Sequence, residues 1–226
     1  MRYTTVLYDL DGTLLDFERA ENTAFRLAVQ KLGIPYSAGF YELYHEINDG
    51  LWKRFELREV SKEDIGRLRF SITFEKLGID ADGEECNRIY KGLLSENVFV
   101  FDGAVEHCKR LLSKGLKLYA VTNGTEYIQR RRLALSGLDK VFIRTFVSEE
   151  TGYSKPDKQY FDYVFANIDE KDKSRIIIIG DSPSSDIKGG LNSGIDTCLF
   201  GGAVSDVMPT YTASDYKEIE EIIFSD

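Results

Sequence analysis

The segment Arg175–Ile179 limits the possible folds more than any other part of the sequence. It runs through four consecutive isoleucines, so a strand built from it has no face suited to water. Such strands occur in parallel sheets that helices cover on both faces. From Gly103 onward, short apolar runs alternate with segments of helical length, as right-handed crossovers require. The sequence therefore predicts an α/β fold with a doubly wound parallel sheet.

The expected elements of this α/β part follow from apolar spacing and from glycines that end the helices. The predicted strands are Thr4–Tyr8, Leu116–Thr122, Phe142–Val147, Arg175–Ile179 and Thr197–Phe200. The predicted helices are Ala104–Lys114, Glu126–Ser136, Asp157–Asn167, Ile187–Ser193 and Tyr216–Ile223.

Between the first strand and this alternating part, the pattern is helical and contains no convincing strand. The expected helices are Phe17–Leu32, Ser37–Leu57 with a break near Gly50, a third from the capping box at Ser61 to Leu77, and Asp82–Ser95. Four helices inserted after one strand predict a separate lid. We therefore expect an α/β catalytic core of residues 1–15 and 98–226, with an all-helical cap domain of residues 16–97.

Charge and composition exclude several classes of protein. A net charge of −9 over 226 residues argues against affinity for nucleic acid polymers or anionic membranes. No apolar run resembles a signal peptide or is long enough to span a bilayer, so a cytoplasmic protein is expected. Three widely spaced cysteines, Cys86, Cys108 and Cys198, predict reduced structural thiols. A monomer and a homodimer are both compatible with the sequence.

Two carboxylates stand where the first strand ends. Asp9 and Asp11 are two residues apart, and strand side chains two apart point to the same side. Gly12 then allows a sharp turn. An Asp-Gly turn would explain this local pattern by itself. It would not explain two adjacent like charges, which a cation or a shared proton stabilises.

Further polar clusters follow later strands. Thr122 and Asn123 end one strand, Asp181 ends another, with Asp186 shortly after it, and Lys155 precedes a helix. Ligands of doubly wound sheets bind outside the carboxyl ends of the strands. We therefore expect these groups to meet in one crevice. Taken singly, Asp186 could be a helix-turn carboxylate, Asn123 a turn residue and Lys155 a solvated lysine.

The order of these clusters resembles the haloacid dehalogenase superfamily of phosphotransferases. Asp9-Leu10-Asp11-Gly12-Thr13 is similar to its first motif, and Thr122 to the hydroxyl of the second. Lys155-Pro156 resembles the third motif, and Gly180–Asp186 the acidic fourth. The helical insertion resembles the C1-type cap of that superfamily. The resemblance covers almost the whole chain and implies a Rossmann-like core.

The resemblance implies a Mg²⁺-dependent phosphatase that forms an aspartyl-phosphate. Asp9 would be the nucleophile, and Asp11 would protonate the leaving oxygen and later deprotonate water. The implied metal ligands are the Asp9 side chain, the Asp11 backbone carbonyl and Asp181, with Asp186 supporting the metal waters. Thr122 and Lys155 would bind the phosphoryl oxygens, helped by backbone N–H groups at Asn123, and Lys155 would also neutralise charge on Asp9.

The partner implied by this resemblance is a small phosphorylated metabolite. The cap stretch containing Trp52 and Arg69 looks like the pyrimidine 5′-nucleotidase branch of subfamily IA. In that branch Trp52 or Phe55 would stack on a base, and Arg69 would meet a polar edge. Trp52 and Arg69 would also be ordinary residues of a helical bundle, in its core or on its solvent-exposed face. Asp11 argues against carbon–halogen cleavage. A phosphatase of phosphoglycolate or of a sugar phosphate, a phosphomutase, and a non-catalytic phosphate-ester-binding protein stay open.

Overall fold

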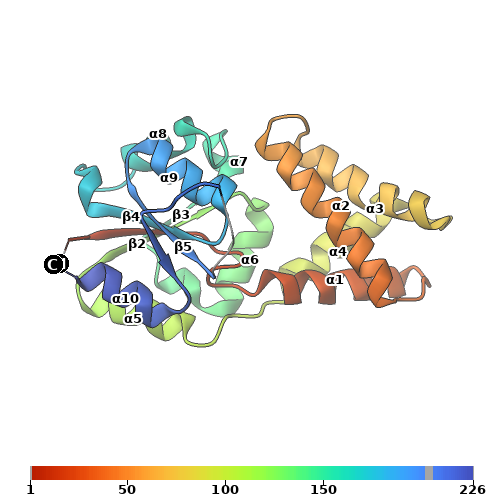
Figure 1. Ribbon diagram of the computed structural model, residues 1–226. Helices are drawn as coiled ribbons and strands as arrows, with labels where there is room; N and C mark the ends of the chain where they lie inside the picture. Colours follow the sequence, from red (N-terminus) through yellow and green to blue (C-terminus); the bar gives the residue numbers. More distant parts are fainter. Residues whose placement is uncertain (1, 202–205, 226) are drawn as a thin grey trace. The chain divides into compact units, whose positions relative to one another are not determined.

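The computed structural model describes residues 2–201 and 206–225. Its internal contacts divide these residues into two compact units (Figure 1). One is an α/β unit, formed by the described residues up to Phe17 together with those from Phe99 onward. The other is a helical unit, Glu18–Val98.

The α/β unit is built on a parallel sheet with the strand order β3-β2-β1-β4-β5-β6. Its strands are β1 Thr5–Tyr8, β2 Lys117–Thr122, β3 Arg144–Val147, β4 Ile176–Gly180, β5 Asp196–Phe200 and β6 Tyr211–Ala213. In the register of the sheet, Tyr8 of β1 pairs with Ala120 of β2 and with Ile179 of β4. The carboxyl ends of these three central strands therefore lie side by side.

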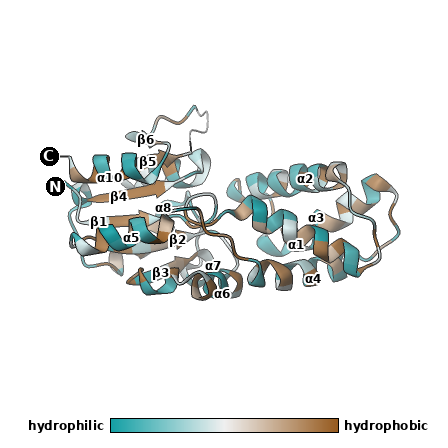
Figure 2. Cartoon of the chain, turned by 90° about the horizontal axis from the view of Figure 1, so that it is seen from below, coloured by the Kyte–Doolittle hydropathy of each residue, from teal (hydrophilic) through white to brown (hydrophobic). Residues whose placement is uncertain are grey.

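Helices cover both faces of this sheet. They are α5 Ala104–Ser113, α6 Glu126–Ser136, α7 Ser148–Thr151, α8 Lys158–Ala166, α9 Lys188–Ser193 and α10 Tyr216–Phe224. Figure 1 shows α5 and α10 on one face of the sheet, and α8 and α9 on the other. All residues of β1 and β4 are buried, and both strands are largely brown in Figure 2. The predicted doubly wound α/β fold is confirmed.

The helical unit contains α1 Phe17–Lys31, α2 Ala38–Glu56, α3 Lys62–Leu77 and α4 Gly83–Glu96. α3 begins with the predicted capping box, in which Ser61 and Asp64 exchange hydrogen bonds, and ends at Gly78 in the left-handed conformation. Aromatic side chains form much of the core, with the rings of Phe25 and Phe70 stacked 5.9 Å apart.

One expectation about this unit is wrong, because α2 continues through Gly50 without a break. Asn48 and Leu51, on either side of Gly50, are both buried. Asn48 also donates a hydrogen bond to Glu21 Oε1 at 2.8 Å. These contacts outweigh the roughly 1 kcal/mol by which an interior glycine disfavours a helix.

The two chain segments that connect the units are hydrogen-bonded to each other in antiparallel orientation, and both belong to the α/β unit. The Asp16 N–H donates to the Phe99 carbonyl at 2.9 Å, and the Phe101 N–H donates to the Leu14 carbonyl at 3.1 Å. Leu15 and Val100 form an antiparallel bridge between these bonds. Both connecting segments therefore lie next to the residues that follow β1, where Asp9 and Asp11 stand.

Two further expectations concern the cysteines and membrane-spanning helices. The three cysteines are buried free thiols, as predicted. Within residues 2–201 and 206–225, no helix combines the length and apolarity that crossing a bilayer would take. The cellular location stays a prediction.

Candidate active site

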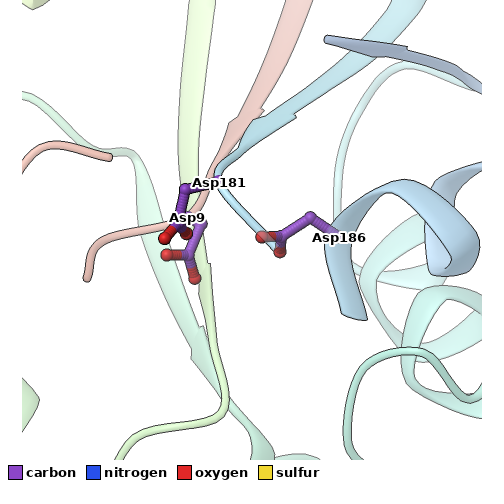
Figure 3. A group of neighbouring side chains, drawn as sticks. All are labelled: Asp9, Asp181 and Asp186. Carbon is purple, nitrogen blue, oxygen red and sulfur yellow. The ribbon is translucent and has the colours of Figure 1, made fainter. Parts of the chain in front are cut away.

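Three carboxylates converge at the carboxyl ends of β1 and β4. Asp9 follows β1 directly, and its N–H donates to the Ile179 carbonyl of β4 at 2.9 Å. Asp181 follows β4, and Asp186 lies one turn further on (Figure 3). One carboxylate oxygen from each of the three lies within 4.8 Å of the others. Oxygen atoms gathered in this way are suited to hold a hard divalent cation.

Two glycines make this convergence possible. Gly12 has φ +80°, and a Cβ atom there would lie 2.1 Å from Oδ2 of Asp181. A Cβ atom at Gly180 would lie 2.2 Å from Oδ2 of Asp186. Any larger residue would therefore displace a carboxylate of the cluster. Gly12 thus serves both the turn and the approach of Asp181.

Lys155 is the buried cation of the site, with 1% of its surface exposed. Its Nζ donates to Asp9 Oδ1 at 2.5 Å, to Asp186 Oδ1 at 2.7 Å and to the Val121 carbonyl at 2.9 Å. All three ammonium protons are thereby used. Burial alone would lower the pKa of Lys155, but the charges of Asp186 and Asp9 outweigh it and raise that pKa above its usual range.

The carboxylates outnumber this ammonium by three to one. Burial raises the pKa of Asp9 well above its usual range, Lys155 opposes the rise, and Asp186 adds to it. Burial, and then the charge of Asp186, raise the pKa of Asp181 to about 7. The described residues therefore leave the cluster short of positive charge, which favours a bound cation.

Asp186 belongs to this cluster as well as to a helix start. Besides the Lys155 bond, its Oδ2 accepts the N–H of Ser182 at 3.1 Å. Ser182 in turn caps the short π-helix Pro183–Ile187, since its Oγ accepts the N–H of Ser185 at 3.2 Å. Both oxygens of Asp186 thus have protein partners, which suits a residue that orients Lys155.

Thr122 is buried at the end of β2 with its side chain in a defined orientation. Its Oγ1 accepts the N–H of Gly124 at 3.0 Å and the Nε2 of Gln129 at 2.9 Å. Its backbone N–H donates to the Tyr160 hydroxyl at 3.1 Å, and that hydroxyl donates to the Phe146 carbonyl at 2.7 Å. Since donors occupy both lone pairs of Oγ1, the hydroxyl proton is available for an acceptor in the site.

The side chain of Asn123 is hydrogen-bonded to the backbone of Lys155. Its Nδ2 donates to the Lys155 carbonyl at 2.8 Å, and its Oδ1 accepts the Lys155 N–H at 2.9 Å. Both amide groups are therefore engaged with the backbone that carries Lys155. A side chain held in this way positions Lys155, and the expected contact of the Asn123 backbone N–H with a phosphoryl oxygen stays a prediction.

Asp11 has partners that the sequence did not indicate. Gln129 Nε2 donates to Asp11 Oδ2 at 2.7 Å, and Arg132 of the same helix forms an ion pair with Asp11 Oδ1. Gln129 and Arg132 are both buried. The sequence signal that could have indicated these contacts is a pair of polar residues three apart on α6, shortly after the polar cluster that ends β2. Tyr160 was also missed, because nothing local marks its bond to Thr122.

The two cap residues expected to bind substrate lie in the helical unit. Trp52 is half-buried, edge-to-face with Phe55 at 5.6 Å. Arg69 is 7% exposed, donates to Asn87 Oδ1 at 2.7 Å and lies 4.4 Å from the ring centroid of Tyr90. The guanidinium of Arg69 therefore lies in the interior of the bundle, which disagrees with the expected contact to a polar edge of the substrate.

Comparison with known proteins identifies the family. A model of the haloacid dehalogenase-like hydrolases matches residues 3–194. The chain belongs to the haloacid dehalogenase-like (HAD-like) hydrolase family. The expected superfamily and the expectation of an enzyme of the hydrolase class are thereby confirmed.

Three relatives match this HAD-like hydrolase over nearly its whole length. YfnB of Bacillus subtilis, a candidate HAD-hydrolase, is 38% identical over 98% of this chain and 96% of its own. A crystal structure of YfnB bound to magnesium, described as revealing interdomain movement, covers 100% of both chains with a TM-score of 0.93. The pyrimidine 5′-nucleotidase PynA of Streptococcus pneumoniae is 34% identical over 97% of this chain and 94% of its own. The pyrimidine 5′-nucleotidase YjjG of Escherichia coli is 27% identical over 99% of each chain.

Proposed function

We propose that this HAD-like hydrolase is a Mg²⁺-dependent phosphatase of small phosphomonoesters, and specifically of nucleoside 5′-monophosphates. The observation that carries the proposal is the convergence of Asp9, Asp181 and Asp186 within 4.8 Å around Lys155. A phosphoryl group brings further negative charge, so such a site is useful only where cations compensate the carboxylates.

The chemistry of the donors fits Mg²⁺. They are carboxylate oxygens, which Mg²⁺ prefers to nitrogen or sulfur ligands. Asp9 and Asp181 would hold the ion together with the Asp11 backbone carbonyl, and Asp186 would orient its waters. When bound, Mg²⁺ would shield the phosphoryl oxygens from the attacking carboxylate. The magnesium in the structure of the relative YfnB supports this assignment.

The residues of the chain have distinct tasks in the proposed reaction. An oxygen of Asp9 attacks phosphorus and forms an aspartyl-phosphate, while the bond from phosphorus to the leaving alcohol breaks. Asp11 gives a proton to the leaving oxygen and then takes one from the water that breaks the Asp9–phosphorus bond. The Thr122 hydroxyl donates to a phosphoryl oxygen, and Lys155 holds Asp9 in place.

The substrate class rests on the relatives. PynA and YjjG are named pyrimidine 5′-nucleotidases, and both align with the helical unit as well as the α/β unit. We propose that the helical unit is the cap and that it selects a pyrimidine nucleotide, with Trp52 as the candidate for stacking on the base. Phosphoglycolate and sugar phosphates are the alternative substrates, and a phosphomutase is the alternative activity.

Phosphate release from a panel of monoesters tests the proposal. The panel contains pyrimidine and purine 5′-monophosphates, phosphoglycolate and hexose phosphates, each assayed with Mg²⁺ and with EDTA. We expect Mg²⁺-dependent hydrolysis with the highest kcat/KM for a pyrimidine nucleotide, and its loss in Asp9→Asn. Asp102→Asn, an exposed aspartate of the same unit, is the control.

Each other outcome has a defined meaning. Full activity of Asp9→Asn, or no phosphate release from any ester with Mg²⁺, would contradict the phosphatase. A sugar phosphate as the best substrate would contradict the nucleotidase alone. A requirement for a sugar bisphosphate would identify a phosphomutase, and tight ester binding without turnover would identify a binding protein.

A further inference from the structure

Two polar residues of α6 are buried beside the reacting groups. Gln129 and Arg132 are 1% and 0% exposed. They are three positions apart, so their side chains share one face of the helix. The proposed reaction uses neither residue directly, and a packed interior does not require them.

Together they hold both oxygens of the Asp11 carboxylate. Gln129 Nε2 donates to Oδ2 at 2.7 Å, and Arg132 Nη1 donates to Oδ1. Asp11 is otherwise only partly enclosed, with 26% of its side chain exposed. A carboxylate with a separate donor on each oxygen cannot rotate without breaking both bonds.

The same amide connects Asp11 to Thr122. Gln129 Nε2 carries two protons, and its second bond goes to Thr122 Oγ1 at 2.9 Å. Gln129 Oε1 accepts from Arg132 Nη1 at 3.1 Å, which fixes the amide in the orientation that points Nε2 toward both acceptors. One helix face thus sets the positions of Asp11, which follows β1, and of Thr122, which ends β2.

Packing does not account for Arg132. Within the described residues, its Nε and Nη2 are buried without a hydrogen-bond partner, and its guanidinium carbon lies 5.6 Å from the centroid of the Phe17 ring. Buried donors without partners destabilise a fold, whereas an apolar side chain of similar length would not. The ion pair with Asp11 is the interaction that arginine provides here and that an apolar side chain would not.

We propose that Gln129 and Arg132 are positioning residues, which hold the Asp11 carboxyl group, protonated when it acts as the acid, against the leaving oxygen and the Thr122 hydroxyl against the phosphoryl group. The proposal rests on the phosphatase function proposed above. Proton donation matters most for an alcohol leaving group, because an alkoxide is a poor leaving group. A nitrophenolate departs without a proton. Loss of positioning at Asp11 must therefore penalise alkyl esters more than nitrophenyl esters.

Arg132→Met tests this by kcat/KM, which reports the steps through phosphoryl transfer. General acid–base catalysis contributes on the order of 100- to 10,000-fold, so we expect a loss of about 10- to 100-fold on uridine 5′-monophosphate. On p-nitrophenyl phosphate we expect a smaller loss, because its leaving group needs no proton and only the hold of Arg132 on the Gln129 amide is weakened. Arg132→Lys, which keeps the charge, should recover part of the activity on the nucleotide. Arg130→Met, on the exposed face of the same helix, should match the wild type on both esters.

A double-mutant cycle separates positioning from a general structural effect. If Arg132 acts through Asp11, Arg132→Met should cost little further activity in an Asp11→Asn background. Equal losses on both esters, or a full additional loss in the Asp11→Asn background, would overturn the proposal. Gln129→Met should lower activity on both esters, because it also releases Thr122.

A failure of the positioning role can be distinguished from a failure of the proposed phosphatase function. A wild-type chain inactive on every ester contradicts the function. The crystal structure of Arg132→Met still tests the positioning, because Asp11 should then leave its present rotamer. An Asp11 carboxylate unchanged in that structure would overturn the proposal by itself.

Discussion

Replacing Asp181 with asparagine should make the metal-free protein more stable, although most substitutions at buried positions destabilise. Asp181 is partly buried beside Asp186 and lies against the backbone of Gly12. Burial and the charge of Asp186 raise the pKa of Asp181 from 3.8 to about 7. A folded state that raises the pKa of an acid favours its neutral form, so ionisation of Asp181 opposes folding.

The size of the effect follows from that shift. The folded-state pKa lies above the unfolded value, so the protein has its full stability below pH 3.8 and loses it as the pH rises through about 7. One pKa unit corresponds to about 1.36 kcal/mol, which sets the penalty at pH 8 to at most about 4 kcal/mol. Asparagine does not ionise. Asp181→Asn should therefore gain about 1 to 4 kcal/mol at pH 8 and almost nothing at pH 4.

Urea unfolding followed by far-UV circular dichroism measures this difference at both pH values, first with EDTA and then with Mg²⁺. A ligand at 100 times its Kd stabilises a fold by about 2.7 kcal/mol. Mg²⁺ should thus stabilise the wild type at pH 8 and leave Asp181→Asn nearly unchanged, so that the difference between the two shrinks or reverses.

Asp139→Asn, an exposed aspartate of the same unit, is the control and should match the wild type. An Asp181→Asn protein that is less stable than the wild type at pH 8 in EDTA would refute the account of a site short of positive charge. Equal stabilisation of both proteins by Mg²⁺ would refute the assignment of Asp181 as a ligand.

Three further predictions concern single contacts. Lys155→Met breaks two buried ion pairs and should cost about 3–5 kcal/mol in urea unfolding at pH 8, with a smaller loss at pH 5, because burial raises the pKa of Asp9 and favours its neutral form. Gly12→Ala places a Cβ atom 2.1 Å from Oδ2 of Asp181 and forces alanine to φ +80°, so calorimetric titration should show weakened Mg²⁺ binding together with about 1–2 kcal/mol of lost stability. The hydrogen bond to Glu21 raises the pKa of His45 from 6.5 to about 9, so that stabilisation is complete below pH 6.5 and is lost as the pH rises toward 9. Melting of the helical unit, followed by its single tryptophan, should show this decline in the wild type, and a decline that persists in His45→Gln would contradict it.

Much of the fold was predictable because the signals are local. The isoleucines of β4 leave that strand without a face suited to water. The ends of α3 at Ser61 and Gly78 depend on residues within one helical turn. The strand β6, Tyr211–Ala213, was missed, because three residues show no period and form a strand by pairing with β5. α2 was expected to break at Gly50, because its burial against α1 is not visible locally.

The sequence by itself determined which chemical groups stand at the ends of β1, β2 and β4, and parallel topology then brought those ends together. Only the tertiary structure decided what each group touches. Asn123 holds the backbone of Lys155, and Arg132 reaches Asp11 from 121 positions away along the chain. Spacing along a sequence reports contacts within one helix or strand, whereas a contact between distant elements depends on how they pack. The roles of Gln129 and Arg132 therefore depend on the packing that brings α6 to Asp11.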